Sequence, residues 1–211
     1  MSISSYINNS LITERLHITS KIKSLRITPK SKEELQSTIK SELERQGPDA
    51  DLNFIDTSLI TDMSWLFNKL NPRNIEIDRW DTSKVTNMSY MFAGCMQFNG
   101  DLSSWNVSNV KYMSSAFQGC YKFKSDLSGW DTSNVKNMYA MFSECKEFEG
   151  KGIENWNVSN VMDMRWMFGA CSNFRSDLSG WDVGNVIQYS NMFAECPNME
   201  FERELHPKFR D

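Results

Sequence analysis

The sequence predicts an α/β solenoid in which six coils of about 25 residues stack on one another. A segment that begins at a tryptophan returns at spacings of 25, 25, 26 and 25 residues. Each copy starts with the alternation typical of a short strand and continues with the spacing typical of a helix. The two ends of the chain depart from this pattern, as the capping units of repeat proteins do. The repeated slot contains Ile55, Trp80, Trp105, Trp130, Trp156 and Trp181.

The first part of each unit predicts a short strand. In the segment LSSWNV, residues 102–107, Leu102, Trp105 and Val107 are expected to face the core. Ser104 and Asn106 are expected to face outward. One such unit cannot bury its apolar face alone, so neighbouring coils must share a continuous core.

The second part of each unit predicts a helix of roughly three turns. Val110, Met113, Phe117 and Cys120 follow one another at steps of 3, 4 and 3 residues, which places them on one helix face. An all-β solenoid of the same period is the main alternative, but strands require an alternation of period two. The residues that suit the N-cap position of these helices are Ser58, Ser83, Ser108, Ser133, Ser159 and, in the last unit, Gly184.

The ends of the chain predict an N-terminal α/β cap over residues 1–50 and a cap or tail over residues 201–211, with the six repeats over residues 51–200. Residues 31–46 predict a helix that begins with a Ser31/Glu34 capping box and stops at Gly47-Pro48. The preceding segment, RLHITSKIKSLRIT, predicts one or two short strands. Because both ends look like caps, we expect a monomer.

The repeat motif W-[DN]-[TV]-S-N-V-x-x-M-x-x-M-F-x-x-C-x-x-F resembles the repeat of BspA-like leucine-rich-repeat surface proteins and of mycoplasma-lipoprotein-type proteins. The strand segment also matches the L-x-x-L-x-L core of leucine-rich repeats. This resemblance implies a leucine-rich-repeat-like solenoid in a bacterial protein of the cell surface or secreted space, with a role in adhesion or protein binding. The resemblance implies no catalytic residues.

Charge and composition exclude several classes of function. The chain has 211 residues and a net charge of −4, without the concentrated basic face typical of nucleic-acid binding. No apolar run approaches the roughly 20 residues of a membrane span, so we expect no membrane insertion. The first twenty residues lack a charged segment followed by an apolar one, so we expect no secretory signal.

The cysteine slot predicts a small buried apolar group rather than chemistry. Its first copy contains Leu70, and no histidine repeats with the cysteines, so we expect neither a metal site nor a cofactor. On the helical model neighbouring cysteines lie about 8–10 Å apart, too far for disulfides. The slot contains Cys95, Cys120, Cys145, Cys171 and Cys196.

Two further slots are candidate binding surfaces. On the strand model, the residue after each tryptophan projects from a concave face and forms an acidic groove for a basic peptide or a cation; the simpler interpretation is that these side chains cap backbone N–H groups of turns. The slot ten residues past the tryptophan contains aromatic residues that can anchor a partner or pack on the neighbouring coil. The candidates are Asp56, Asp81, Asn106, Asp131, Asn157 and Asp182 in the first slot, and Trp65, Tyr90 and Trp166 in the second.

These features predict a non-enzymatic scaffold that binds a protein or peptide. Solenoids offer broad surfaces without a catalytic constellation. Catalysis is disfavoured because His17 and His206 both lie outside the repeats and no nucleophile elbow or phosphate-binding loop is present. A structural or self-assembling solenoid without a small ligand is the alternative.

Overall fold

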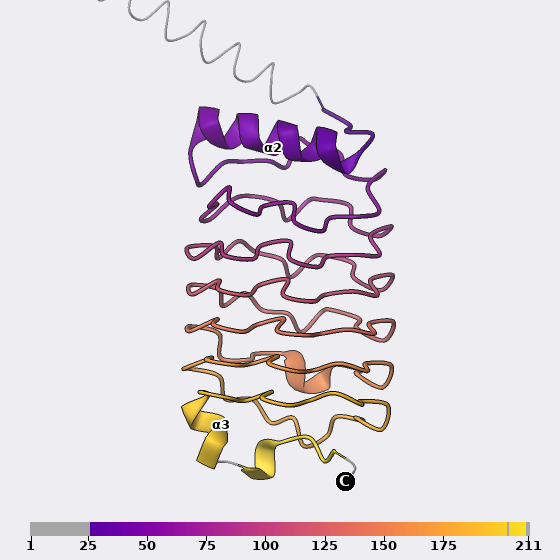
Figure 1. Cartoon of the computed structure of the whole chain (residues 1–211). Coiled ribbons are helices and arrows are strands. Elements are labelled where there is room, and N and C mark those ends of the chain that lie inside the picture. Colours follow the sequence, from indigo (N-terminus) through magenta and orange to yellow (C-terminus); the bar gives the residue numbers. More distant parts are fainter. Residues whose placement is uncertain (1–25, 202, 210–211) are drawn as a thin grey trace, which may run out of the picture.

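The computed structural model describes residues 26–201 and 203–209, which form a stack of similar loops (Figure 1). Helix α2 (Lys32–Gln46) lies across one end of the stack, and the short helix α3 (Pro197–Phe201) lies at the other end. The described part also contains two 3-10 turns, η1 (Ile153–Asn155) and η2 (Arg203–Leu205). None of the helices among these residues has both the length and the apolar character needed to cross a membrane.

The predicted coil of one strand and one helix is wrong. The described repeats consist of turns joined by isolated parallel bridges, so the fold is not an α/β solenoid of six coils. Each bridge joins residues about one repeat apart, so successive repeats occupy successive loops. One column of bridges links Asp62, Asn87, Tyr112, Asn137, Asp163 and Gln188, each to the next.

The partners of the backbone N–H groups explain why the second part of each described repeat is not a helix. Met113 N–H donates to Asn137 O in the next loop at 3.0 Å, and Ser115 N–H donates to Tyr139 O at 2.7 Å. The next residue, Ala116, donates its N–H to Met113 O, three residues back, and closes a turn. An α-helix needs each N–H to reach the carbonyl four residues back. The 3-4-3 spacing therefore arises from successive turns that return side chains to one face.

Left-handed backbone in two slots of the repeat also prevents a helix. Ser115 has a φ of 53° and Gly119 a φ of 73°. A residue with a β-carbon pays roughly 1–2 kcal/mol for this conformation, and such strain persists only where surrounding contacts fix the backbone. Here the hydrogen bonds to the next loop provide those contacts. The first slot contains Trp65, Tyr90, Ser115, Ala140, Trp166 and Asn191, all with positive φ.

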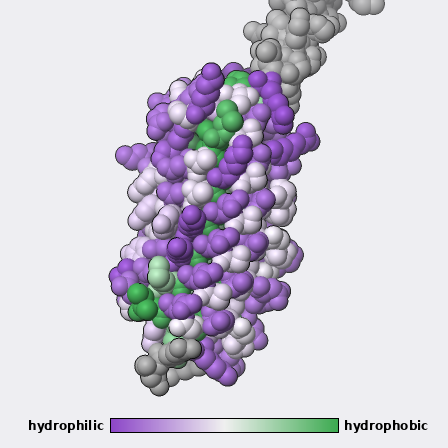
Figure 2. Space-filling view, turned by 90° about the vertical axis from the view of Figure 1, so that its right-hand side faces the viewer, coloured by the Kyte–Doolittle hydropathy of each residue, from purple (hydrophilic) through white to green (hydrophobic). Residues whose placement is uncertain are grey.

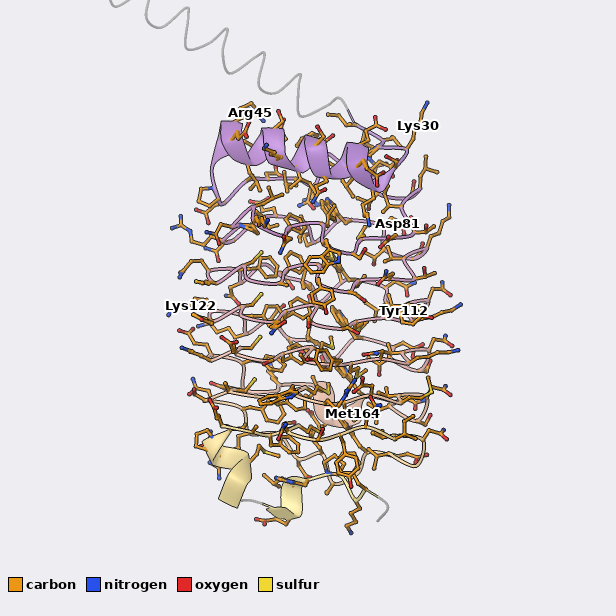
Figure 3. All side chains as sticks on the ribbon, in the orientation of Figure 1. Lys30, Arg45, Asp81, Tyr112, Lys122 and Met164 are labelled. Atoms are coloured by element: carbon orange, nitrogen blue, oxygen red, sulfur yellow. The ribbon has the colours of Figure 1, made fainter. Side chains whose placement is uncertain are left out.

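The core consists of columns of equivalent side chains that run along the stack; Met164, labelled in Figure 3, is one of its fully buried members. The rings of Phe117 and Phe142 stack with their centroids 5.5 Å apart. The indole N–H of Trp130 donates to Leu102 O, so the buried polar atom of the tryptophan is paired. The predicted inward direction of the tryptophan, methionine, phenylalanine and cysteine slots is confirmed, although turns rather than helices produce it.

The predicted helix over residues 31–46 is confirmed. The Ser31 hydroxyl accepts a hydrogen bond from Glu34 N–H at 3.2 Å, and the Glu34 carboxylate accepts one from Lys30 N–H at 2.8 Å. Gly47, with a φ of 87°, ends the helix. Leu35 and Ile39 are fully buried, so α2 covers the open apolar end of the first loop.

The remaining end segments have mixed outcomes. The predicted N-terminal strands lie mostly outside the described residues, as does the segment inspected for a secretory signal; the described part contributes a parallel bridge between Ile27 and Ile55. The one-residue insertion before Trp156 is absorbed by η1. The C-terminal segment packs against the last loop, with Leu205 O accepting a hydrogen bond from Leu178 N–H at 2.8 Å.

Candidate functional site

The residues that follow the tryptophans, here called the Asp/Asn row, all close turns. Each side-chain oxygen accepts a hydrogen bond from the backbone N–H two residues later; for Asp81 and Ser83 the distance is 2.9 Å. These bonds confirm the simpler interpretation, and the concave strand face expected beneath the row does not exist among the described residues. The row consists of Asp56, Asp81, Asn106, Asp131, Asn157 and Asp182.

The row lies on a hydrophilic face of the stack. Asp81 and Tyr112 lie along one edge in Figure 3, and Figure 2 shows that face with mostly hydrophilic side chains around a narrow line of hydrophobic ones. Hydrogen bonds from the Ser83 side chain and backbone hold the pKa of Asp81 below its ordinary value, and Ser133 does the same for Asp131. Asp81 and Asp131 are therefore ionised near neutral pH, but one oxygen of each carboxylate already accepts a turn hydrogen bond.

The same turn occurs in other slots, so the row is not distinguished by its hydrogen bonding. Asp101 and Asp126 each accept from the N–H two residues later, at 2.9 and 3.0 Å. Asn87 and Asn137 do so in the column of bridges. The repeated Asp and Asn residues of this sequence are thus explained largely by turn formation.

The serines predicted as helix N-caps belong to these turns instead, because no helix follows them in the described repeats. Their carbonyls accept hydrogen bonds from the next loop: Asn109 Nδ2 donates to Ser83 O at 2.7 Å, and Asn134 Nδ2 donates to Ser108 O at 2.8 Å. The same hydrogen bond from an asparagine side chain to a serine carbonyl of the preceding loop recurs at Asn160 and Asn185.

The aromatic candidates do not form one continuous surface. Trp65 and Tyr90 stack on each other, with ring centroids 4.0 Å apart and an interplanar angle of 6°. Trp166 occupies the same slot but is separated from this pair by Ser115 and Ala140. The Trp166 side chain is 38% exposed and makes no ring contact among the described residues. Trp65 is also exposed, at 47%, but one face of its ring is taken by Tyr90, whereas Trp166 has no ring partner among the described residues.

Trp166 lines a pocket of about 530 Å³, here called the Trp166 pocket. The other walls carry two carboxylates, from Glu144 and Glu195, and the ammonium of Lys146. The Lys146 Nζ atom lies over the Tyr121 ring, 4.4 Å from its centroid. The remaining lining residues are mostly polar or small and include Gln118, Tyr139, Ala140, Ser143, Gly169, Ala170 and Ser172.

Three residues of the pocket occupy slots that vary between repeats. Gly169 is buried, and a β-carbon added there would come within 2.8 Å of the Trp166 indole, so a glycine gives the indole room. The slot of Glu144 and Glu195 contains glycine in two earlier repeats, at Gly94 and Gly119, all with positive φ. Two glutamates thus stand where the backbone favours glycine, as Lys69 and Ala170 also do in other copies of this slot.

Sequence reasoning predicted Trp166 but missed Glu144, Glu195, Lys146 and Gly169. The signal was present in the slot fourteen residues past the tryptophan, which contains glycine at Gly94 and Gly119 and charged or small residues in the other copies. The predicted helix hid the positive φ of this slot, because a right-handed helix contains no left-handed residue.

The five cysteines are free and buried. Burial raises the pKa of the Cys95 thiol to about 12, and it raises the pKa of Cys120 and Cys145 as well. The Sγ atom of Cys120 donates to Phe92 O in the preceding loop. These groups are protonated core side chains rather than reactive thiolates. The described residues contain no group of three or more His, Cys, Asp or Glu side chains placed to hold a metal ion.

Comparison with known proteins identifies one family. The model of a family described as Mycoplasma protein of unknown function, DUF285, matches residues 40–152 and 115–206. No curated protein and no solved structure matches the chain. The two matched segments overlap and cover the stacked loops together with the end of α2.

Proposed function

The chain belongs to this mycoplasma-type repeat family, and we propose that it is a non-enzymatic scaffold that binds a protein partner through the Trp166 pocket. The pocket receives a lysine or arginine side chain of that partner. The observation that carries the proposal is the position of the exposed Trp166 indole beside the Glu144 and Glu195 carboxylates.

The chemistry of the pocket suits a cation. An indole face attracts ammonium and guanidinium groups, and two carboxylates add charge complementarity. The only cation among the lining residues, Lys146, already lies over the Tyr121 ring. Nearby, the Arg165 guanidinium lies 5.3 Å from the centroid of the Tyr139 ring. Cations are thus already held on aromatic rings next to the pocket.

Binding without catalysis fits the composition of the repeats, which contain no histidine. The resemblance to BspA-like surface proteins supports a partner outside the cell, and the covering of one end by α2 supports a monomeric scaffold. A purely structural role is the alternative. It is favoured because every residue of the Asp/Asn row accepts a hydrogen bond that closes a turn.

Short Gly-Ser peptides that carry two arginines, two lysines or two glutamates test the proposal by fluorescence anisotropy. We expect the cationic peptides to bind and the glutamate peptide not to bind. Trp166→Asn should weaken binding about tenfold or more, and it should fold, since Asn191 occupies the same slot with a φ of 61°. The double variant Glu144→Gln and Glu195→Gln should weaken binding as well.

Matched controls come from the chain itself. Tyr112→Asn removes an exposed aromatic residue outside the pocket and restores the asparagine found at Asn87 and Asn137. Glu44→Gln removes an exposed carboxylate on α2. Both should bind as the parent does. Equal affinity of Trp166→Asn and the parent would refute the pocket, and loss of binding in an Asp81→Asn, Asp131→Asn variant alone would move the site to the Asp/Asn row.

A further inference from the structure

The last loop ends in a row of backbone N–H groups, here called the donor edge. In the preceding loop, Met164, Trp166, Phe168 and Ala170 donate to carbonyls of the last loop, at Gln188, Ser190, Met192 and Ala194. The equivalent donors one repeat later have no acceptor among the described residues. The donor edge consists of the N–H groups of Tyr189, Asn191, Phe193 and Glu195.

The donor edge can only donate. The carbonyls of Tyr189, Asn191 and Phe193 already accept turn hydrogen bonds from residues three positions later. An ordinary extended strand presents both N–H and C=O groups along its edge. If such a strand docked here, its N–H groups would face the N–H groups of the donor edge and would find no acceptor. The edge therefore selects a ligand that offers oxygens alone.

A loop of this repeat offers such an edge. Along residues 112–118, the groups that face the preceding loop are the carbonyls of Tyr112, Ser114, Ala116 and Gln118, which accept from Met88, Tyr90, Phe92 and Gly94. Every second residue supplies an acceptor, in register with every second donor. We propose that the donor edge binds a segment of another chain that carries a further copy of this 25-residue repeat.

An intact second copy does not provide this segment in the described conformation. Helix α2 lies across the first loop (Figure 1), and Gln36 Nε2 donates to two carbonyls of that loop, Leu66 O at 3.3 Å and Trp65 O at 3.2 Å. Two donor edges also cannot pair with each other. The occupant is therefore a repeat segment whose carbonyl side is uncovered.

The C-terminal segment competes for the apolar part of this end. The Phe209 ring stacks on Tyr189 with the centroids 4.0 Å apart, and the His206 ring lies 4.4 Å from that of Phe193. These rings cover side chains of the last loop but accept none of the four N–H groups. An incoming loop replaces these ring contacts, so Phe209→Ala should strengthen its binding.

Amide hydrogen exchange on the full chain tests the proposal, with a synthetic peptide of residues 105–129 as the probe. In the free protein the four edge amides should exchange fast, while those of Met164, Trp166, Phe168 and Ala170 exchange slowly. The peptide should slow exchange at the edge by about tenfold or more, and a scrambled peptide should not.

Three outcomes would overturn the proposal. The edge amides could already be as slow as their counterparts in the free chain, which would mean that the edge is covered. The repeat peptide could bind without slowing them, or inorganic phosphate alone could protect them equally, which would make the edge an anion site. Phe209→Ala provides a second check, since weaker binding of the peptide to this variant would contradict displacement of the tail.

Discussion

The Asp/Asn row and the Trp166 pocket are built on the same stack of loops but relate to the repeat in opposite ways. Each residue of the row makes the same turn hydrogen bond as its equivalents, as Asp81 and Asn106 illustrate. The pocket is made in slots whose residues vary from repeat to repeat, namely those of Trp166, Gly169 and Glu144. The comparison teaches that regular columns in this protein account for folding, whereas departures from the column mark the candidate site.

The largest expected effect lies in a regular column. Phe142→Ala removes a fully buried ring that stacks between Phe117 and Phe168, at 5.5 and 5.9 Å. The free energy of unfolding should fall by about 3–5 kcal/mol, because transfer and cavity costs add. Urea unfolding followed by circular dichroism measures this change. A loss below that of Tyr112→Asn, an exposed control, would show that the column is not what holds the loops together.

The next effect concerns the row itself. Asp131→Ala removes the acceptor for Ser133 N–H, so the free energy of unfolding should fall by about 1 kcal/mol. Asp131→Asn should be nearly neutral, because Asn106 and Asn157 make the same turn in neighbouring repeats. Urea unfolding of both variants distinguishes the turn from the charge. Equal losses in the two variants would show that charge, not turn formation, selects aspartate here.

A smaller effect of opposite sign is expected in the pocket. Glu144→Gly places glycine on backbone with a φ of 63°, as in Gly94 and Gly119, so the free energy of unfolding should rise by about 0.5–1 kcal/mol. The same change removes a pocket carboxylate and should weaken binding of the arginine peptide. Thermal unfolding and anisotropy measure the two quantities. A destabilised variant would indicate that the glutamate side chain serves the fold.

The sequence predicted what depends on periodicity and failed where backbone conformation decides. The repeat length, the inward slots and the helix over residues 31–46 were predictable, because apolar spacing and capping residues report burial and helix ends. The steps from Val110 to Cys120 were misread as a helix, since successive turns and a helix return side chains to one face at similar spacing. Only the left-handed slots, occupied in one repeat by Ser115 and Gly119, distinguish the two.

The candidate site was predictable in part for the same reason. Trp166 was recognisable as an aromatic residue in a variable slot. The regularity of the Asp/Asn row suggested a binding surface, but the side-chain oxygens of the row mostly accept hydrogen bonds within turns. Glu144 and Glu195 could be recognised only by knowing that their slot is left-handed. Side-chain periodicity does not carry that information, because it reports which face a residue shares and not the sign of φ.

The smallest effect is a dependence of stability on pH. Hydrogen bonds within the turns hold the pKa of Asp56, Asp81 and Asp131 below the ordinary value of 3.8. The native state therefore binds fewer protons at these groups than the unfolded chain. Their contribution is fully present above that ordinary pKa and is lost as the pH falls through the lower, native pKa.

A triple variant with asparagine at these three positions keeps the turn acceptors and removes the titration, as Asn106 and Asn157 do naturally. Below about pH 4, its free energy of unfolding should decline less steeply with falling pH than that of the parent. Other carboxylates continue to titrate in both proteins; Asp49, for instance, has a pKa lowered to about 2 by its hydrogen bond from Arg73. Urea unfolding at a series of pH values compares the two slopes. Identical slopes would mean that the turns do not lower the pKa of these three aspartates. The turn hydrogen bonds of the row would then not favour the ionised carboxylate over the neutral one.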